Sequence, residues 1–195
     1  MTNVEICRWD GLASEPEGPV HDRRIAEIDR IFFTSSATQS FASSDAKAAF
    51  RERWLGRYLR HFPQHAFVAT APGGEIVGYV IGSLKDPAHD PLFADLPFLA
   101  MFGALTERYP AQLHINLDAA WRGQGIGARL VNAFADDARA AGAPGVHVVT
   151  TRGMRNVGFY AANGFLERGA VVIDGRELLF LGRDLSPSPT GIKRT

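Results

Sequence analysis

Apolar residues recur every three or four positions in two stretches of the first half of the chain. This spacing predicts helices over Asp22–Phe33 and Ser44–His61, with Ser44 placed to cap the second one. In that second helix Phe50, Trp54 and Tyr58 recur every four residues, which favours packing in a core. Short runs of apolar and β-branched residues predict three strands, which are Val4–Trp9, Ala66–Ala71 and Glu75–Leu84.

The second half continues with strands and helices in alternation. The predicted elements are a strand at Gln112–Leu117, a helix at Ile126–Ala141, a strand at Val146–Thr151, a short helix at Asn156–Asn163, and a hairpin of Phe165–Ile173 and Arg176–Leu181 around Asp174-Gly175. This order predicts an α/β (α+β) fold, with a mixed central sheet of about seven strands flanked by about four helices. We expect one domain over residues 1–185 and a disordered polar tail over residues 186–195.

One long stretch, Lys85–Pro110, has no clear period. It contains four prolines and an apolar middle that could form a helix over Pro97–Tyr109. A connection of this length in a compact domain is often functional, so it could border a binding pocket. A packed insertion with no chemical role is the equally open alternative.

Charge and cysteine content exclude several classes of protein. Lys+Arg and Asp+Glu both number 21, so a balanced chain of this kind does not indicate a nucleic-acid partner or an anionic membrane surface. The single cysteine, Cys7, allows neither an internal disulfide nor a cysteine-rich zinc module, and we expect no bound metal. No leader and no apolar run of membrane-spanning length is present, so we expect a cytoplasmic protein with no membrane partner.

The most informative segment places Gly123, Gly125 and Gly127 between a strand and the start of a long helix. N–H groups at a helix start form an anion site, and glycines let a phosphate approach the backbone closely. The spacing is not that of a nucleoside-triphosphate loop. It also does not match the glycine fingerprint of nucleotide-dependent oxidoreductases. A diphosphate site is therefore the functional interpretation, and a plain tight turn is the alternative for the glycines alone.

Two motifs together resemble a known family. Arg122-Gly-Gln-Gly-Ile-Gly127 is similar to the Arg/Gln-x-x-Gly-x-Gly/Ala signature of the GNAT superfamily of acyl-CoA N-acyltransferases. Phe159-Tyr-Ala-Ala-Asn-Gly-Phe165 resembles the family's second block, and the resemblance covers about residues 76–185. More weakly, the ending Leu181–Leu185 and the stretch Lys85–Pro110 resemble the acetyltransferase-like C-terminal domain of the O-GlcNAc hydrolase (O-GlcNAcase).

The resemblance implies acetyl-CoA as cosubstrate and an amine, on a small molecule or a protein, as acceptor. It places the cofactor on the backbone and side chains of a set of residues that comprises Asn116, Leu117, Arg122, Gly123, Gln124, Gly125, Ile126, Gly127, Ala128, Asn156 and Tyr160. Gly153 stands where the family often has an asparagine. Glycine has no side chain, so the contact that this asparagine usually makes to the cofactor is not expected here. A homodimer is left open.

Acyl transfer to an amine needs a proton donor for the leaving thiolate and a base for the amine. The resemblance makes Tyr160 the candidate acid, with packing of its helix as the alternative. His114, Asn116 and Asp118 share one face of their strand because side chains alternate. His114 is the candidate base, or else a structural histidine, and His147 is a weaker candidate. Asp118 is favoured as a brace for the glycine turn over a catalytic role.

The sequence supports two functions from different classes. The leading hypothesis is an acetyl-CoA-dependent N-acetyltransferase in which the amine attacks the thioester directly. The alternative is a module of the same fold that binds acetyl-CoA, or another protein, without catalysis.

Overall fold

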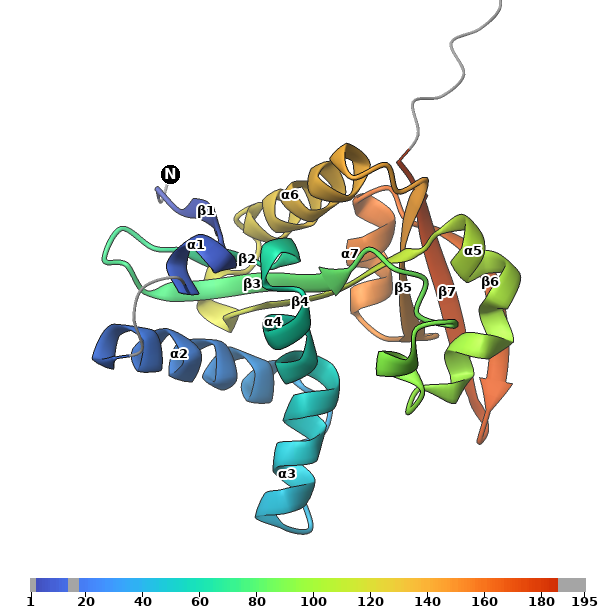
Figure 1. The fold of residues 1–195 in the computed structure, drawn as a ribbon, viewed down its shortest axis with the longest axis horizontal. Helices are drawn as coiled ribbons and strands as arrows, with labels where there is room; N and C mark the ends of the chain where they lie inside the picture. The colour runs from blue at the N-terminus through green and yellow to red at the C-terminus, as the bar shows by residue number, and fades with distance from the viewer. Residues whose placement is uncertain (1–2, 14–17, 186–195) are drawn as a thin grey trace, which may run out of the picture. The chain divides into compact units, whose positions relative to one another are not determined.

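The computed structural model describes residues 3–13 and 18–185, whose fold is shown in Figure 1. The strands form one sheet of seven in the order β1-β2-β3-β4-β5-β7-β6. Their bounds are β1 Glu5–Arg8, β2 Phe67–Thr70, β3 Ile76–Ser83, β4 Ala111–Leu117, β5 Gly145–Thr151, β6 Leu166–Ile173 and β7 Arg176–Asp184. β4 and β5 run parallel, whereas β1 with β2, β2 with β3, β5 with β7 and β6 with β7 are antiparallel. The predicted single α/β domain with a mixed sheet of about seven strands is confirmed. The tail expected at residues 186–195 lies outside the described residues.

The described residues form more helices than the predicted four. The α-helices are α1 Trp9–Ala13, α2 Pro19–Ser35, α3 Ser44–Arg51, α4 Arg57–His61, α5 Gly103–Arg108, α6 Ile126–Ala140 and α7 Asn156–Ala162. The 3₁₀ turns are η2 Pro63–His65, η3 Pro91–Phe93, η4 Pro97–Phe102 and η5 Ala119–Trp121. The first predicted strand, Val4–Trp9, was one residue too long at each end. At its C-terminal end Trp9 begins α1 and donates its N–H to the carbonyl of Ala66 at 2.9 Å.

The helix predicted over Ser44–His61 is present but is not uniform. Its N-cap is Ser43, whose hydroxyl accepts from the N–H of Ala46, and not Ser44 as expected. Between α3 and α4 the chain forms one π-helical segment, η1 (Glu52–Gly56), closed by a bond from the N–H of Arg57 to the carbonyl of Glu52. The apolar period alone does not reveal this extra residue in the turn.

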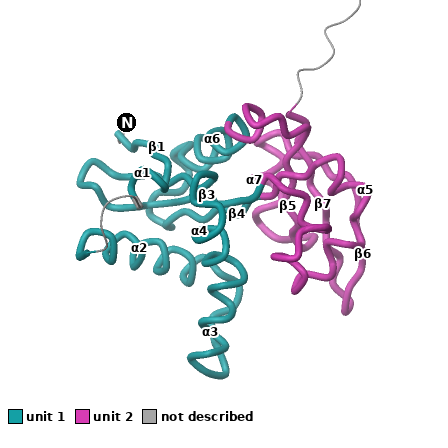
Figure 2. Tube along the Cα trace, in the orientation of Figure 1, with its two compact units in different colours: residues 1–83, 113–136 teal, residues 84–112, 137–195 magenta. Residues whose placement is uncertain are grey.

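The chain divides into two compact units, coloured separately in Figure 2. Unit 1 comprises residues 1–83 and 113–136, and unit 2 comprises residues 84–112 and 137–195. β4 and α6 each have residues in both units.

In unit 1 the sheet is covered on both faces. β3 is buried along its whole length, which suits its continuous apolar sequence. A side chain at Gly78 would collide with Leu117 of β4 and crowd Leu130 of α6, so this glycine allows α6 to approach the sheet closely. α2 lies on the other side of β3 from α6 (Figure 1) and buries Ile28 and Ile31.

In unit 2 the irregular stretch forms part of the core. Phe102 and Tyr109, which flank α5, are buried against Phe180 of β7. The partly buried side chains of Phe98 and Leu105 pack on the same cluster. Of the two alternatives for Lys85–Pro110, a packed insertion therefore describes its second half, with a 3₁₀ turn followed by α5 in place of one continuous helix.

Candidate functional site

The glycine turn of unit 1 has the backbone geometry that its sequence predicts. Gly123 and Gly125 have φ of +75° and +76°, a left-handed conformation that glycine adopts at little cost. A Cβ built on either residue meets no atom within 4 Å, so the backbone here borders open space. Gly125 accepts the first bond of α6, from the N–H of Arg129 at 3.2 Å. The N–H groups of the first helical turn, through Ala128, therefore lie at the positive end of α6.

Two polar side chains of the turn fold back on it. The guanidinium of Arg122 donates to the carbonyl of Leu117 at 3.2 Å and to the hydroxyl of Ser35 at 3.4 Å. The side-chain amide of Gln124 donates to the carbonyl of Ala120 at 3.3 Å. Both residues remain exposed, so they tie the turn together and still face solvent.

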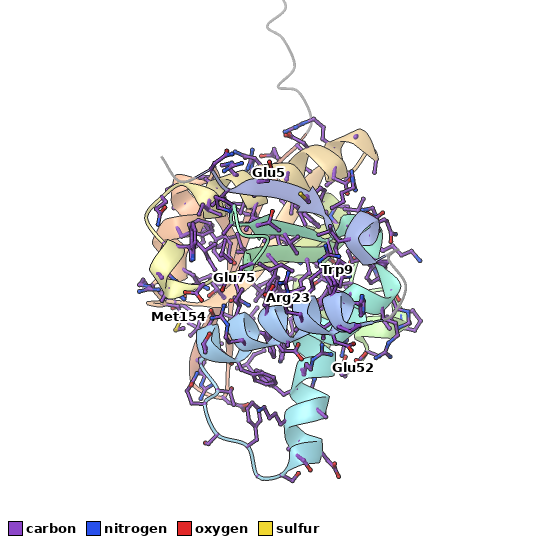
Figure 3. All side chains as sticks on the ribbon, turned by 90° about the vertical axis from the view of Figure 1, so that its left-hand side faces the viewer. Glu5, Trp9, Arg23, Glu52, Glu75 and Met154 are labelled. Atoms are coloured by element: carbon purple, nitrogen blue, oxygen red, sulfur yellow. The ribbon has the colours of Figure 1, made fainter. Side chains whose placement is uncertain are left out.

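Asp118 connects this turn to α2. One of its carboxylate oxygens accepts from the N–H of Ala120 at 3.0 Å, and the other pairs with Arg30. The hydrogen bond from Arg30 is the main reason that the pKa of Asp118 lies below its usual value, and the N–H of Ala120 adds to this effect. Arg30 also contacts Glu75 at 3.4 Å, and Figure 3 labels Glu75 beside α2. The carboxylate of Asp118 thus braces the turn and stays ionised.

Asn116, the next residue on the same face of β4, binds a buried phenol. Its side-chain amide donates to the hydroxyl oxygen of Tyr79 on β3 at 2.7 Å. Burial raises the pKa of Tyr79 far above its usual value, and the bond from Asn116 opposes that rise only in part. Tyr79 is therefore a neutral hydroxyl at physiological pH. Leu117, the following residue, points to the opposite face, toward the position of Gly78.

His114 contacts two aromatic side chains of the helical segment that crosses this face. Its Nε2 lies 3.0 Å from the hydroxyl of Tyr58 on α4. The rings of Tyr58 and Trp54 meet the imidazole edge-on, with centroids 5.1 Å and 5.6 Å away. Tyr58 is fully buried, whereas His114 and Trp54 are half-buried. The imidazole therefore lies against two aromatic rings and within hydrogen-bond distance of the Tyr58 hydroxyl.

The second motif lies in unit 2. Tyr160 on α7 is 6% exposed, and its ring packs edge-on against Phe159 and Phe165. Burial raises the pKa of Tyr160 well above its usual value, so the phenol stays protonated. Tyr160 therefore has the packing contacts that a structural role requires and the protonated hydroxyl that a proton donor requires.

The segment before α7 carries Gly153 where the family often has an asparagine. Gly153 has φ of +84°, a left-handed conformation that glycine adopts at little cost. Asn156, the first residue of α7, is exposed, and its side-chain oxygen accepts from the hydroxyl of Thr150 at 2.9 Å.

His147 in unit 2 has a structural environment. It is 1% exposed, stacks on Phe180 with centroids 4.5 Å apart, and bonds through Nδ1 to the carbonyl of Tyr109. Because a carbonyl only accepts, Nδ1 carries the hydrogen. Burial lowers the pKa of His147 to about 4. The interpretation of His147 as a weaker candidate base is wrong, since a side chain so completely buried cannot meet an acceptor.

The structure brings together His114, Asn116 and Asp118 on one face of β4, each with a partner that the sequence did not identify. These partners are Tyr58, Tyr79 and Arg30. All three come from elements 37 to 88 residues earlier in the chain, so no local spacing pairs them. The only available signal was that Tyr58 and Tyr79 are large polar aromatics on otherwise apolar faces.

Comparison with known proteins shows the family of this chain. The model of the acetyltransferase (GNAT) family matches residues 24–165, and the chain belongs to this family. The SsHAT structure is 22% identical, with a TM-score of 0.68, and the alignment covers 94% of this chain and 99% of that one. An N-acetyltransferase from Staphylococcus aureus Mu50 is 18% identical, with a TM-score of 0.60 and coverage of 95% and 100%. A structure of the NatC complex bound to Gag peptide and CoA is 13% identical, with a TM-score of 0.62 and coverage of 94% and 99%. The likeness to the O-GlcNAcase domain stays a prediction.

Two further findings concern the described part of the chain only. Within residues 3–13 and 18–185 no helix is both long and apolar enough to cross a bilayer. The same residues contain no group of three or more His, Cys, Asp or Glu side chains that could hold a metal ion. The cytoplasmic location and the absence of a metal stay predictions from the sequence.

Proposed function

We propose that this chain is an acetyl-CoA-dependent N-acetyltransferase that binds the diphosphate of its cosubstrate at the turn Arg122–Ala128. The observation that carries the proposal is the pair of left-handed glycines, Gly123 and Gly125, directly before the first turn of α6. A Cβ on either glycine would occupy the open space beside the backbone that a phosphate needs. Membership of the GNAT family supports the same ligand.

The remaining predicted contacts fit the same ligand. The amides of Gln124, Ile126 and Gly127 belong to the turn and the helix start, where an anion is stabilised by the helix dipole. The backbone of Asn116 and Leu117 offers polar groups to the pantetheine arm. Asn156 of unit 2 can offer its side-chain N–H groups, because Thr150 holds the oxygen of the same amide.

Acetyl-CoA, when bound, supplies the acetyl group as a thioester. In the proposed reaction His114 takes the proton that the amine nitrogen loses as its bond to the acetyl carbon forms. Tyr160 gives its hydroxyl proton to the sulfur as the carbon–sulfur bond breaks. A neutral phenol suits this role, because burial keeps the hydroxyl protonated at physiological pH. Asn116 orients the reacting carbonyl, and Asp118 keeps the adjoining turn in place through Ala120.

The acceptor is proposed to be an amine that approaches the face of β4 carrying His114. Trp54 and His114 are the half-buried side chains there, so the acceptor would meet an aromatic edge and an imidazole. That Lys85–Pro110 borders the acceptor stays a prediction, and its second half packs in the core of unit 2. Within unit 2, residues 87–100 line a hollow of about 240 Å³.

The test separates binding from catalysis. Calorimetric titration of the full chain with acetyl-CoA and with CoA should give saturable binding at one site. Release of free thiol from acetyl-CoA should then be measured against a panel of alkyl amines, aryl amines and peptides with free N-termini. Binding with amine-dependent thiol release supports the transferase. Binding without release by any amine supports the non-catalytic module that holds acetyl-CoA. Absence of binding contradicts the transferase and leaves only a module that binds another protein.

A further inference from the structure

A change of helical phase separates the aromatic residues of the segment Ser44–His61. An added residue in a helical turn rotates the downstream residues by about 100° relative to an uninterrupted α-helix. Upstream of the π-helical segment η1, Phe50 packs on Phe32 and Phe41, with centroids 5.5 Å and 5.2 Å away. Within and after η1, Trp54 and Tyr58 pack on His114 instead. The three aromatics that share one sequence period therefore serve two different clusters.

The last residue of η1, Gly56, lies beneath the side chain of Glu52. A Cβ at Gly56 would collide with the carboxylate of Glu52, which folds over this position and accepts from Arg60 at 2.7 Å. Figure 3 labels Glu52 on this helical segment. π-helical turns are rare and occur frequently at functional sites, because they redirect side chains at a cost in helical regularity. Here the redirected side chains are the two that contact His114.

Tyr58 contacts His114 at a defined ring nitrogen. The distance of 3.0 Å from its hydroxyl to Nε2 is that of a hydrogen bond, and the phenol is fully buried. A neutral imidazole carries its hydrogen on one nitrogen only, and a base must keep the lone pair of the other. If Nε2 holds the hydrogen and donates it to the Tyr58 oxygen, the lone pair lies on Nδ1. After proton uptake the same bond persists and stabilises the imidazolium.

We infer that Tyr58 is a positioning residue that holds His114 in the Nε2–H tautomer, and that η1 orients Tyr58 and Trp54 for this purpose. The inference rests on the proposed function in taking His114 as the base. Tyr58 does not touch the acceptor, because its side chain is buried. It acts through the imidazole, as hydrogen-bond partners do that fix the tautomer and orientation of a catalytic histidine.

The first experiment is side-chain ¹⁵N NMR of the full-length chain, with His114 assigned by comparison with His114→Gln. Wild-type protein above the pKa of His114 is expected to show hydrogen on Nε2 and none on Nδ1. The opposite tautomer would overturn the inference, and this measurement needs no altered Tyr58.

The second experiment uses Tyr58→Phe, which keeps the ring and removes the hydroxyl. The tautomers of His114 should become mixed and its pKa should fall, because the imidazolium loses an acceptor. For an amine substrate kcat should fall about tenfold, the worth of about one hydrogen bond, while the KM for acetyl-CoA stays constant. Tyr79→Phe is the matched control, since it removes a buried phenol hydroxyl from the same sheet face but should leave the tautomer of His114 unchanged.

An unchanged tautomer and an unchanged pH profile in Tyr58→Phe would overturn the inference. Failure of the proposed function has a different signature, namely no saturable binding of acetyl-CoA or no thiol release by wild-type protein. The NMR result decides the positioning role in either case.

Discussion

Asp118 at the end of β4 forms an ion pair with Arg30 in the middle of α2, 88 residues earlier in the chain. The same carboxylate caps the 3₁₀ turn that leads into the glycine turn, through the N–H of Ala120. The turn that we propose as the cofactor site is thereby joined to α2. This connection makes the shape of the turn depend on both ends of the pair.

Asp118→Asn should weaken acetyl-CoA binding by a few fold and change the free energy of unfolding by less than about 1 kcal/mol. The stability effect is small because the Arg30 side chain is 45% exposed and the pair is screened by solvent. Arg30→Met should match Asp118→Asn, since both retain an oxygen that accepts from Ala120. Asp118→Ala should weaken binding further because the bond to Ala120 is also lost. Equal calorimetric affinities for Arg30→Met and Asp118→Ala would show that the brace at Ala120 has no part in binding.

Side chains added to the glycine turn should abolish acetyl-CoA binding while the protein remains folded. Gly127→Val adds a branched side chain in the first turn of α6, where φ is not left-handed. Gly125→Ala fills the open space beside the turn but also strains a residue at φ +76°, by about 1–2 kcal/mol. Gly142→Ala is the matched control, because it has φ +83° and open space around it at the far end of α6.

Comparison of the three variants distinguishes the effect of backbone strain on stability from the effect of a side chain that blocks the phosphate position. Gly142→Ala should lose stability and keep its affinity for acetyl-CoA, as measured by calorimetry together with circular dichroism. If both turn variants bind as tightly as wild type, the diphosphate does not lie at this turn.

Tyr160→Phe should lower turnover by about 10²–10⁴, the usual contribution of one positioned proton donor. Affinity for acetyl-CoA should change little, because Phe keeps the ring packed on Phe159 and Phe165. The loss should shrink with an acyl donor whose thiol is more acidic, since that thiolate leaves with less help. Wild-type turnover of the variant on a true acceptor would reduce Tyr160 to a packing residue.

His147 should make the protein less stable as the pH falls from about 6.5 to about 4. Burial lowers the pKa of His147 to about 4 in the folded protein. Between this pH and about 6.5 the imidazole is therefore protonated in the unfolded chain but neutral in the folded one. The free energy of unfolding therefore rises with pH there, and the full effect is on the order of 3 kcal/mol.

His147→Asn isolates this effect, because its amide can still donate to the carbonyl of Tyr109 but does not titrate. Urea unfolding at pH 7.5, 6.5, 5.5 and 4.5 should show a smaller pH slope for the variant than for wild type. Parallel curves for the two proteins would mean that His147 takes up its proton equally in both states.

Gly56→Ala should not increase the free energy of unfolding, although replacing Gly by Ala usually stabilises a helix. Ala is favoured over Gly in a helix interior by about 1 kcal/mol. At residue 56, however, the new Cβ must displace the carboxylate of Glu52 and disturb its bond to Arg60. Gly158→Ala in α7 is the control, since no atom lies within 4 Å of its added Cβ. Thermal unfolding should show a gain for Gly158→Ala and none for Gly56→Ala, and equal gains would contradict this account of η1.

The sequence by itself determined the fold class, the order of the seven strands, and the glycine turn. These features depend on local rules: β3 is continuously apolar, Asp174-Gly175 demands left-handed φ values, and glycines at 123 and 125 permit them. The face shared by His114, Asn116 and Asp118 also follows from strand alternation alone. Where the local pattern was ambiguous, as in the assignment of Ser44 as the cap of α3, prediction was wrong by one residue.

Only the tertiary structure decided what those residues contact. The pairs His114 with Tyr58, Asn116 with Tyr79 and Asp118 with Arg30 join segments far apart in the chain, so they arise from packing and leave no spacing to detect. The π-helical turn at η1 is invisible to an apolar period, because one added residue changes the direction of Tyr58 without changing its hydrophobicity. Burial likewise made His147 a neutral core residue, since the cost of charging an imidazole depends on surroundings that only the folded chain creates.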